Sequence, residues 1–282
     1  MFETYPLLFG LLAALSWGLY DYWSAKLAKK IGYQRAYFEN SFSAAAILLI
    51  ILLAGNQIVL PTGNSLAIVL FLSIVSFLGS LLVYKSFSIG KVSINSPIST
   101  LYMIVAIIGV AIITRSTMPL VKLGLAVATV LSSVLVAFHT LNLKEYKIEK
   151  GVIYSALAAL CFTFTGTLPA VIKNQVHEPT FALIIIAVTA ICVSIMNWKQ
   201  IAKWSKHMSL IGVVVGLLYL LGWLFYFYGV NSANSVLAVA ITGLFPVVPV
   251  ILSAIRREEI LQQHQKLALA AMFISLTAFL LL

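Results

Sequence analysis

Long apolar segments, separated by short groups of charged residues, Pro, Gly and Asn, divide this sequence and limit its fold more than any single motif does. Hydrophobic residues make up 62% of the 282 residues and charged residues only 9%, far below the proportion in a soluble domain. A spanning helix needs roughly 20 apolar residues, so the chain accommodates about ten spans and almost no domain outside the bilayer. Because lipid offers backbone groups no hydrogen-bond partner, we expect an all-α integral membrane protein. The ten expected spans cover residues 5–25, 36–54, 65–87, 92–114, 119–138, 151–172, 179–197, 209–230, 234–255 and 266–282.

Positive charges gather in alternate connections between the expected spans. Fifteen of the eighteen Lys and Arg residues lie in the odd-numbered connections, and only Arg115, Lys122 and Lys173 lie beside the even-numbered ones. We expect a multi-pass protein of the plasma membrane, and the positive-inside rule predicts that the odd connections lie in the cytoplasm and both termini outside. The same bias accounts for the formal net charge of +10 without a nucleic-acid partner.

The longest polar connection, His139–Lys150, divides the chain into halves of five expected spans, which we assign to residues 1–140 and 148–282. Because five is odd, the two halves are expected to be inverted relative to each other. Short similarities support the repeat, and they align Ala14–Trp17 with Ala159–Phe162, and Leu78–Gly79 with Leu221–Gly222. Inverted repeats around a site at the bilayer midplane are typical of secondary transporters.

Three stretches of the sequence carry a family resemblance. They are Ala13–Gly18, Tyr226–Val230, and Ile241–Val248 leading to the acidic pair Glu258–Glu259. These stretches resemble the EamA-type branch of the drug/metabolite transporter superfamily. The first half departs from the pattern, because Met103 stands where the second half has Pro246 and Arg115 where it has an acid. The resemblance implies a ten-helix transporter with a central cavity between the halves, which moves small metabolites such as amino acids, often outward.

Asp21, the only aspartate of the chain, lies on a polar face of the first expected span together with Trp17 and Tyr20. A carboxylate inside a membrane predicts a functional site by default. The alternative is a structural ion pair with Lys85, which the expected topology places at a similar depth, or snorkelling of Lys85 to the interface. If Asp21 and Lys85 both face the cavity, they could hold the two ends of a zwitterion such as an amino acid.

Further candidate binding residues form stripes on three other expected spans. Large rings with polar groups suit a cavity wall, although an aromatic belt at the membrane interface is the alternative for them. Hydroxyl and amide groups can line the cavity or only join helices to one another. The candidates are Tyr219, Trp223 and Tyr226 in the eighth span, Asn95, Ser99 and Tyr102 in the fourth, and Thr163 and Thr167 in the sixth.

Enzymatic chemistry has little support in the sequence. The four histidines lie in or beside loops without the spacing of a metalloprotease, and one aspartate cannot form an intramembrane aspartate pair. No Walker loop is present, so ATP is not the expected energy source. We therefore expect no catalytic residue, no metal and no cofactor, but a small-molecule substrate and, as a candidate, a coupling proton. A membrane-embedded enzyme or a lipid-binding scaffold is the alternative function.

Overall fold

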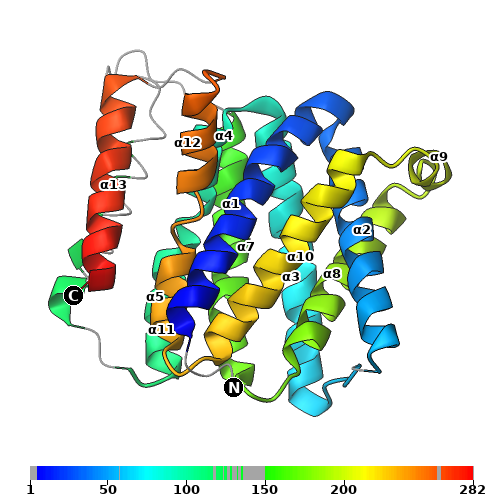
Figure 1. Ribbon diagram of the computed structural model, residues 1–282, viewed down its shortest axis with the longest axis horizontal. Helices are drawn as coiled ribbons and strands as arrows, with labels where there is room; N and C mark the ends of the chain where they lie inside the picture. Colours follow the sequence, from blue (N-terminus) through cyan, green and yellow to red (C-terminus); the bar gives the residue numbers. More distant parts are fainter. Residues whose placement is uncertain are drawn as a thin grey trace.

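The computed structural model describes residues 5–281 except 57, 117–118, 123, 126–127, 129–131, 133–134, 136–149 and 259–261. Every secondary-structure element in this described part is helical, as the sequence predicts, and the helices form one bundle (Figure 1). The elements are α1 (Pro6–Ile31), α2 (Tyr33–Ala54), α3 (Gly63–Ile89), α4 (Val92–Ser99), α5 (Tyr102–Ile113), α7 (Lys150–Thr167), the 3-10 helix η1 (Leu168–Ile172), α8 (Glu178–Met196), α9 (Ile201–Ser205), α10 (Leu210–Asn231), α11 (Ser235–Thr242), α12 (Val247–Ile255) and α13 (Gln263–Leu281).

Seven helical stretches among the described residues are long and apolar enough to cross a membrane. Each overlaps one of the expected spans, and together they make the chain a multi-pass membrane protein. α1 and α13 cover the first and last expected spans but are not among the seven. Most of the expected span 119–138 lies outside the described residues, so the expected total of ten stays a prediction. The seven stretches are 33–54, 63–89, 92–113, 150–172, 178–196, 210–231 and 235–255.

Two of these spans are interrupted in the middle. Between α4 and α5, the amide of Leu101 bonds to the carbonyl of Ile98 at 3.2 Å, a tighter turn than that of an α-helix. Between α11 and α12, the amide of Leu244 makes the corresponding bond to Ile241 at 3.0 Å. The alignment of Leu78–Gly79 with Leu221–Gly222 puts both interruptions at the same position of the repeat. The break between α4 and α5 therefore forms although Met103 replaces Pro246 there.

The closest packing joins the two halves of the chain. α1 packs most extensively on α10, and α3 packs almost as extensively on α7. α1 and α10 are antiparallel, because Gly222 lies against Trp17 whereas Gly229 lies against Phe9. Glycine at 222 permits this approach, since a Cβ there would overlap the Trp17 indole.

α3 and α7 form the second antiparallel pair. Ser65, at the start of α3, donates a hydrogen bond of 2.8 Å to Gln175, which follows η1. α1 and α3 end at the same end of the bundle, where the Ser24 hydroxyl lies 3.2 Å from the Tyr84 hydroxyl. The sequence register makes α7 the counterpart of α1 and α10 the counterpart of α3, so each helix runs opposite to its counterpart. This is the geometry that an inverted repeat requires.

A buried carboxylate holds α2 against the start of α10. Glu39 is fully buried and accepts a hydrogen bond of 2.9 Å from Arg35 Nε. It also accepts bonds from the amide and the hydroxyl of Ser209 at 3.0 and 2.6 Å. A negative charge stabilises the amino-terminal end of a helix, so Glu39 has a structural role that explains its burial.

The membrane orientation predicted from the positive charges can be tested by labelling. Single cysteines at Asn56 and Lys199, which are both exposed, would be introduced after replacement of Cys161 and Cys192. In intact cells, a membrane-impermeant maleimide is expected to label position 56 and to leave position 199 unlabelled until the cells are opened. Labelling of position 199 in intact cells would show that the predicted orientation is inverted.

Candidate functional site

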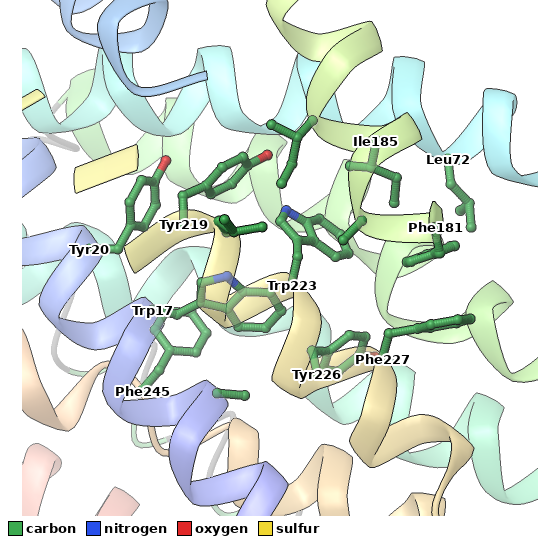
Figure 2. Close-up of a cluster of buried hydrophobic side chains, with 14 of the residues drawn as sticks. Trp17, Tyr20, Leu72, Phe181, Ile185, Tyr219, Trp223, Tyr226, Phe227 and Phe245 are labelled. Carbon is green, nitrogen blue, oxygen red and sulfur yellow. The ribbon is translucent and has the colours of Figure 1, made fainter. Parts of the chain in front are cut away.

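A cavity lies near the centre of the bundle, between helices of both halves. Its volume is about 50 Å³, which is room for a few water molecules. Most of its wall is aromatic, and α1 and α10 supply the largest rings (Figure 2). Eight of the twelve candidate binding residues line it, namely Trp17, Tyr20, Asp21, Ser99, Tyr102, Tyr219, Trp223 and Tyr226. The remaining lining residues are Ser80, Val83, Phe162, Thr165, Gly166 and Phe245.

The aromatic wall is built around Trp17. The ring centroids of Trp17 and Trp223 are 5.5 Å apart with the rings nearly perpendicular, and the Tyr226 ring lies 5.2 Å from Trp17. Tyr20 and Tyr219 make a second pair one turn along, with centroids 5.2 Å apart. All five residues are more than nine-tenths buried, and the edge-to-face pair of Trp17 with Trp223 stabilises the wall beyond simple burial. Helical periodicity places these rings on the facing sides of α1 and α10.

Two fully buried polar atoms of this wall have no hydrogen-bond partner among the described residues. They are the hydroxyl of Tyr219 and the indole nitrogen Nε1 of Trp223, both buried. The hydroxyl of Tyr226, by contrast, donates to the carbonyl of Gly166 at 2.7 Å. Buried donors without a partner are uncommon, and at the edge of a cavity they are available to a ligand.

Asp21 lies on the cavity wall with its side chain almost completely buried. Its carboxylate accepts a short hydrogen bond from the hydroxyl of Ser96 in α4. No cation pairs with it among the described residues. The ammonium of Lys85 instead lies over the ring of Tyr33, 4.6 Å from its centroid, in a cation–π contact. The structure therefore does not bring Asp21 and Lys85 together as an ion pair.

Three more candidates lie outside the cavity wall. Asn95 donates to the carbonyl of Ser86 at 3.0 Å. Thr163 donates to the carbonyl of Ala159, one turn earlier in its own helix, at 3.0 Å. Thr167 packs against Gly109 in α5. Like Lys85, these three side chains contact neighbouring helices or their own backbone and do not line the cavity.

The lining residues that the sequence analysis missed fall on the register of the internal repeat. The counterparts on α1 and α7 are 145 residues apart, and those on the other helices 143 residues apart. The repeat register could have identified them, although their side chains are small or apolar and two of them carry only a hydroxyl group. The pairs are Trp17 with Phe162, Tyr20 with Thr165, Asp21 with Gly166, Ser80 with Trp223, Val83 with Tyr226, and Tyr102 with Phe245.

An ion pair joins the two halves at the end of the bundle where α1 ends. Lys26 Nζ lies 2.6 Å from Glu258 Oε1, and the hydroxyl of Tyr22 donates to the same carboxylate at 3.0 Å. In the sequence Glu258 follows Arg256 and Arg257, and the structure pairs it with Lys26 from the other half. Partial burial raises the pKa of Glu258, but the hydrogen bonds from Lys26 and Tyr22 outweigh it, so the pKa lies below its usual value.

Glu258→Gln is expected to lower the free energy of unfolding in detergent by less than about 1 kcal/mol at pH 7, because the pair is one-third exposed. The pKa of Glu258 is lower in the folded protein, so its stabilising effect is present above the unfolded pKa and is lost as the pH falls through the folded one. Denaturant unfolding of the wild type and the variant, at pH 7 and at acidic pH, measures the difference in their free energies of unfolding. A difference between wild type and variant that grows on acidification would contradict the assigned pairing.

Comparisons with known proteins agree with this architecture. The model of the EamA-like transporter family matches residues 4–138 and again residues 149–281. A solved structure described only as "Crystal structure of protein" is 11% identical to this chain and has a TM-score of 0.72, with 99% of this chain and 97% of that chain covered. At this identity the likeness shows the fold alone. No curated protein matches the sequence.

Proposed function

Because the chain belongs to the EamA-like transporter family, we propose that it is a secondary transporter of small metabolites that works by alternating access. The central cavity carries this proposal, since it is walled by both repeats at equivalent positions. We further propose ten spans, arranged as two inverted five-helix repeats in residues 1–140 and 148–282, in the plasma membrane. The antiparallel pairs of α1 with α10 and α3 with α7 support the inverted arrangement.

Transport requires the cavity to change size. Sites for small molecules usually have volumes of about 300–1,000 Å³, whereas this cavity has about 50 Å³. The described conformation is therefore contracted, and the rings of Trp17 and Trp223 must separate to admit a metabolite. The breaks between α4 and α5 and between α11 and α12 lie beside the cavity and supply places where the spans can bend.

The finer parts of the proposal concern the solute, the direction and the coupling. Amino acids and other small metabolites, moved outward, are the substrates that the resemblance implies. Asp21 is the group that could bind a coupling proton, since it is the one acidic side chain among the described residues of the cavity wall. A membrane-embedded enzyme or a lipid-binding scaffold is the alternative, and no described feature of the cavity favours either one.

Flux into proteoliposomes tests the proposal. The purified protein would be reconstituted and assayed with a radiolabelled panel of amino acids, amines and other metabolites. Saturable uptake that protein-free vesicles lack, and that Trp17→Ala together with Trp223→Ala reduces, is the expected result. Absence of saturable flux for the whole panel would count against transport and in favour of the alternative.

A further inference from the structure

The cavity has an unbalanced set of charges. Fourteen described residues line it, and Asp21 is the one acid among them, with no Lys, Arg or His beside it. Lys85, the basic residue expected there, lies over Tyr33. A ligand therefore meets one carboxylate, a few hydroxyls and the faces of aromatic rings.

Because the cavity is buried, its single negative charge selects among ligands by their charge. A charge in a membrane interior is costly unless an opposite charge is close to it. An ionised Asp21 with a monocation forms a neutral complex, whereas a zwitterion leaves one net negative charge and an anion leaves two. The hydrogen bond from Ser96 positions the carboxylate but does not neutralise it. The cavity therefore favours a ligand with one positive charge.

The aromatic wall favours the same ligand. The faces of Trp and Tyr rings attract cations, most strongly when water is excluded. Trp17, Tyr20 and Tyr102 all line the cavity beside Asp21. The free hydroxyl of Tyr219 and the free Nε1 of Trp223 can donate to an uncharged polar group on the ligand.

We infer that the transported solutes are organic monocations, with an ammonium group against Asp21 and an apolar or aromatic body among the rings. This substrate class rests on the transport function proposed above. It differs from the amino-acid interpretation, which required Lys85 to hold a carboxylate.

Four compounds with the same aromatic body and different charges test the inference. At neutral pH, 2-phenylethylamine is a cation, phenylalanine a zwitterion, 3-phenylpropionate an anion and 2-phenylethanol uncharged. Their affinities for the purified full-length protein would be measured by calorimetric titration. The amine is expected to bind about tenfold more tightly than phenylalanine, or better, as one compensated charge predicts. The anion is expected to bind most weakly.

Two variants assign the selectivity to the cavity. Asp21→Asn should remove the preference for the amine and leave the affinity for 2-phenylethanol within about twofold of the wild-type value. Glu178→Gln is the matched control, because it neutralises a carboxylate that is bonded to Asn231 away from the cavity, and it should keep the preference. A cooperative thermal unfolding transition shows that a variant is folded. If one variant does not fold, the order of the four affinities in the wild-type protein still tests the inference.

Three results would overturn the inference. They are phenylalanine binding as tightly as the amine, an amine preference that persists in folded Asp21→Asn, and the absence of binding by all four compounds. The transport proposal fails separately. Saturable flux of an amino acid without amine binding would refute only the cation class, whereas amine binding without flux of any compound would refute transport and still support the selectivity of the cavity for cations.

Discussion

Asp21→Asn is expected to reduce saturable flux in proteoliposomes by about 100-fold, which corresponds to roughly 3 kcal/mol for a lost charge-assisted contact. The reason is that, among the described residues, Asp21 is the one carboxylate on the cavity wall and has no cationic side chain paired with it. Asn keeps the size and a hydrogen-bond acceptor for Ser96 but cannot take up a proton or balance a cationic group. Initial rates of uptake over a range of substrate concentrations measure the loss.

Measurements of stability distinguish a role of Asp21 in transport from a structural role. Because Asp21 makes no described ion pair, Asp21→Asn should unfold at the same denaturant concentration as the wild type, or at a higher one, since a buried charge is removed. Lys85→Met, which removes the cation–π contact with Tyr33, should leave flux nearly unchanged. If Asp21→Asn instead unfolds easily and adding Lys85→Met restores both stability and flux, the two residues form an ion pair and Asp21 has no direct role in transport.

Hydropathy determines most of this fold, because spanning helices are set by one requirement, the satisfaction of backbone hydrogen bonds in lipid. That is why seven of the expected spans coincide with described helical stretches that are long and apolar enough to cross a membrane, and why α1 and α13 cover two more. Their ends are less predictable. α1 continues to Ile31, beyond the expected end at residue 25, because Lys26, Lys29 and Lys30 extend the helix past the apolar segment. A charged residue ends a hydrophobic segment without ending a helix.

The candidate site was predictable where one helix face carries large polar rings. Trp17, Tyr20 and Asp21, with Tyr219 and Trp223, follow helical spacing and line the cavity as a group. Whether each binds a substrate stays a prediction. The hydroxyl candidates divide into two groups, because Ser99 lines the cavity, whereas Thr163 bonds to its own backbone, as a Thr in a helix can, and does not line it.

The sequence left the direction of the Lys85 side chain open between Asp21 and the membrane interface, and whether Lys85 binds a substrate stays a prediction. The depth of a residue follows from its position along a span, but the direction of a long side chain depends on neighbours far away in sequence. For Lys85 this neighbour is Tyr33, at the start of α2. Ser80 has only one small hydroxyl group and Gly166 has no side chain, so neither is conspicuous in the sequence, and the alignment of the two repeats is what relates them to Trp223 and Asp21.

Gly222→Ala is expected to destabilise the protein by about 1–3 kcal/mol, the usual cost of overpacking a filled interior. The added Cβ would overlap the indole of Trp17, a rigid group held between Trp223, Tyr226 and Phe245. Relief requires α1 to move away from α10 or Trp17 to move into the cavity. Either response should also weaken substrate binding, because both change the aromatic wall.

A double-mutant cycle tests whether Trp17 is the group that Gly222 accommodates. In a Trp17→Ala background the space beside position 222 is open, so Gly222→Ala should cost almost nothing or should stabilise the helix slightly, as Ala does relative to Gly. Gly229→Ala on the same helix is the matched control, since its Cβ would meet only Ala238 at 3.0 Å and Phe9 at 3.6 Å. Denaturant unfolding of the four proteins of the cycle gives the coupling energy. If Gly222→Ala lowers the free energy of unfolding by the same amount with and without the Trp17 indole, α1 and α10 do not approach each other through this pair, and Trp17 does not form the centre of the cavity wall.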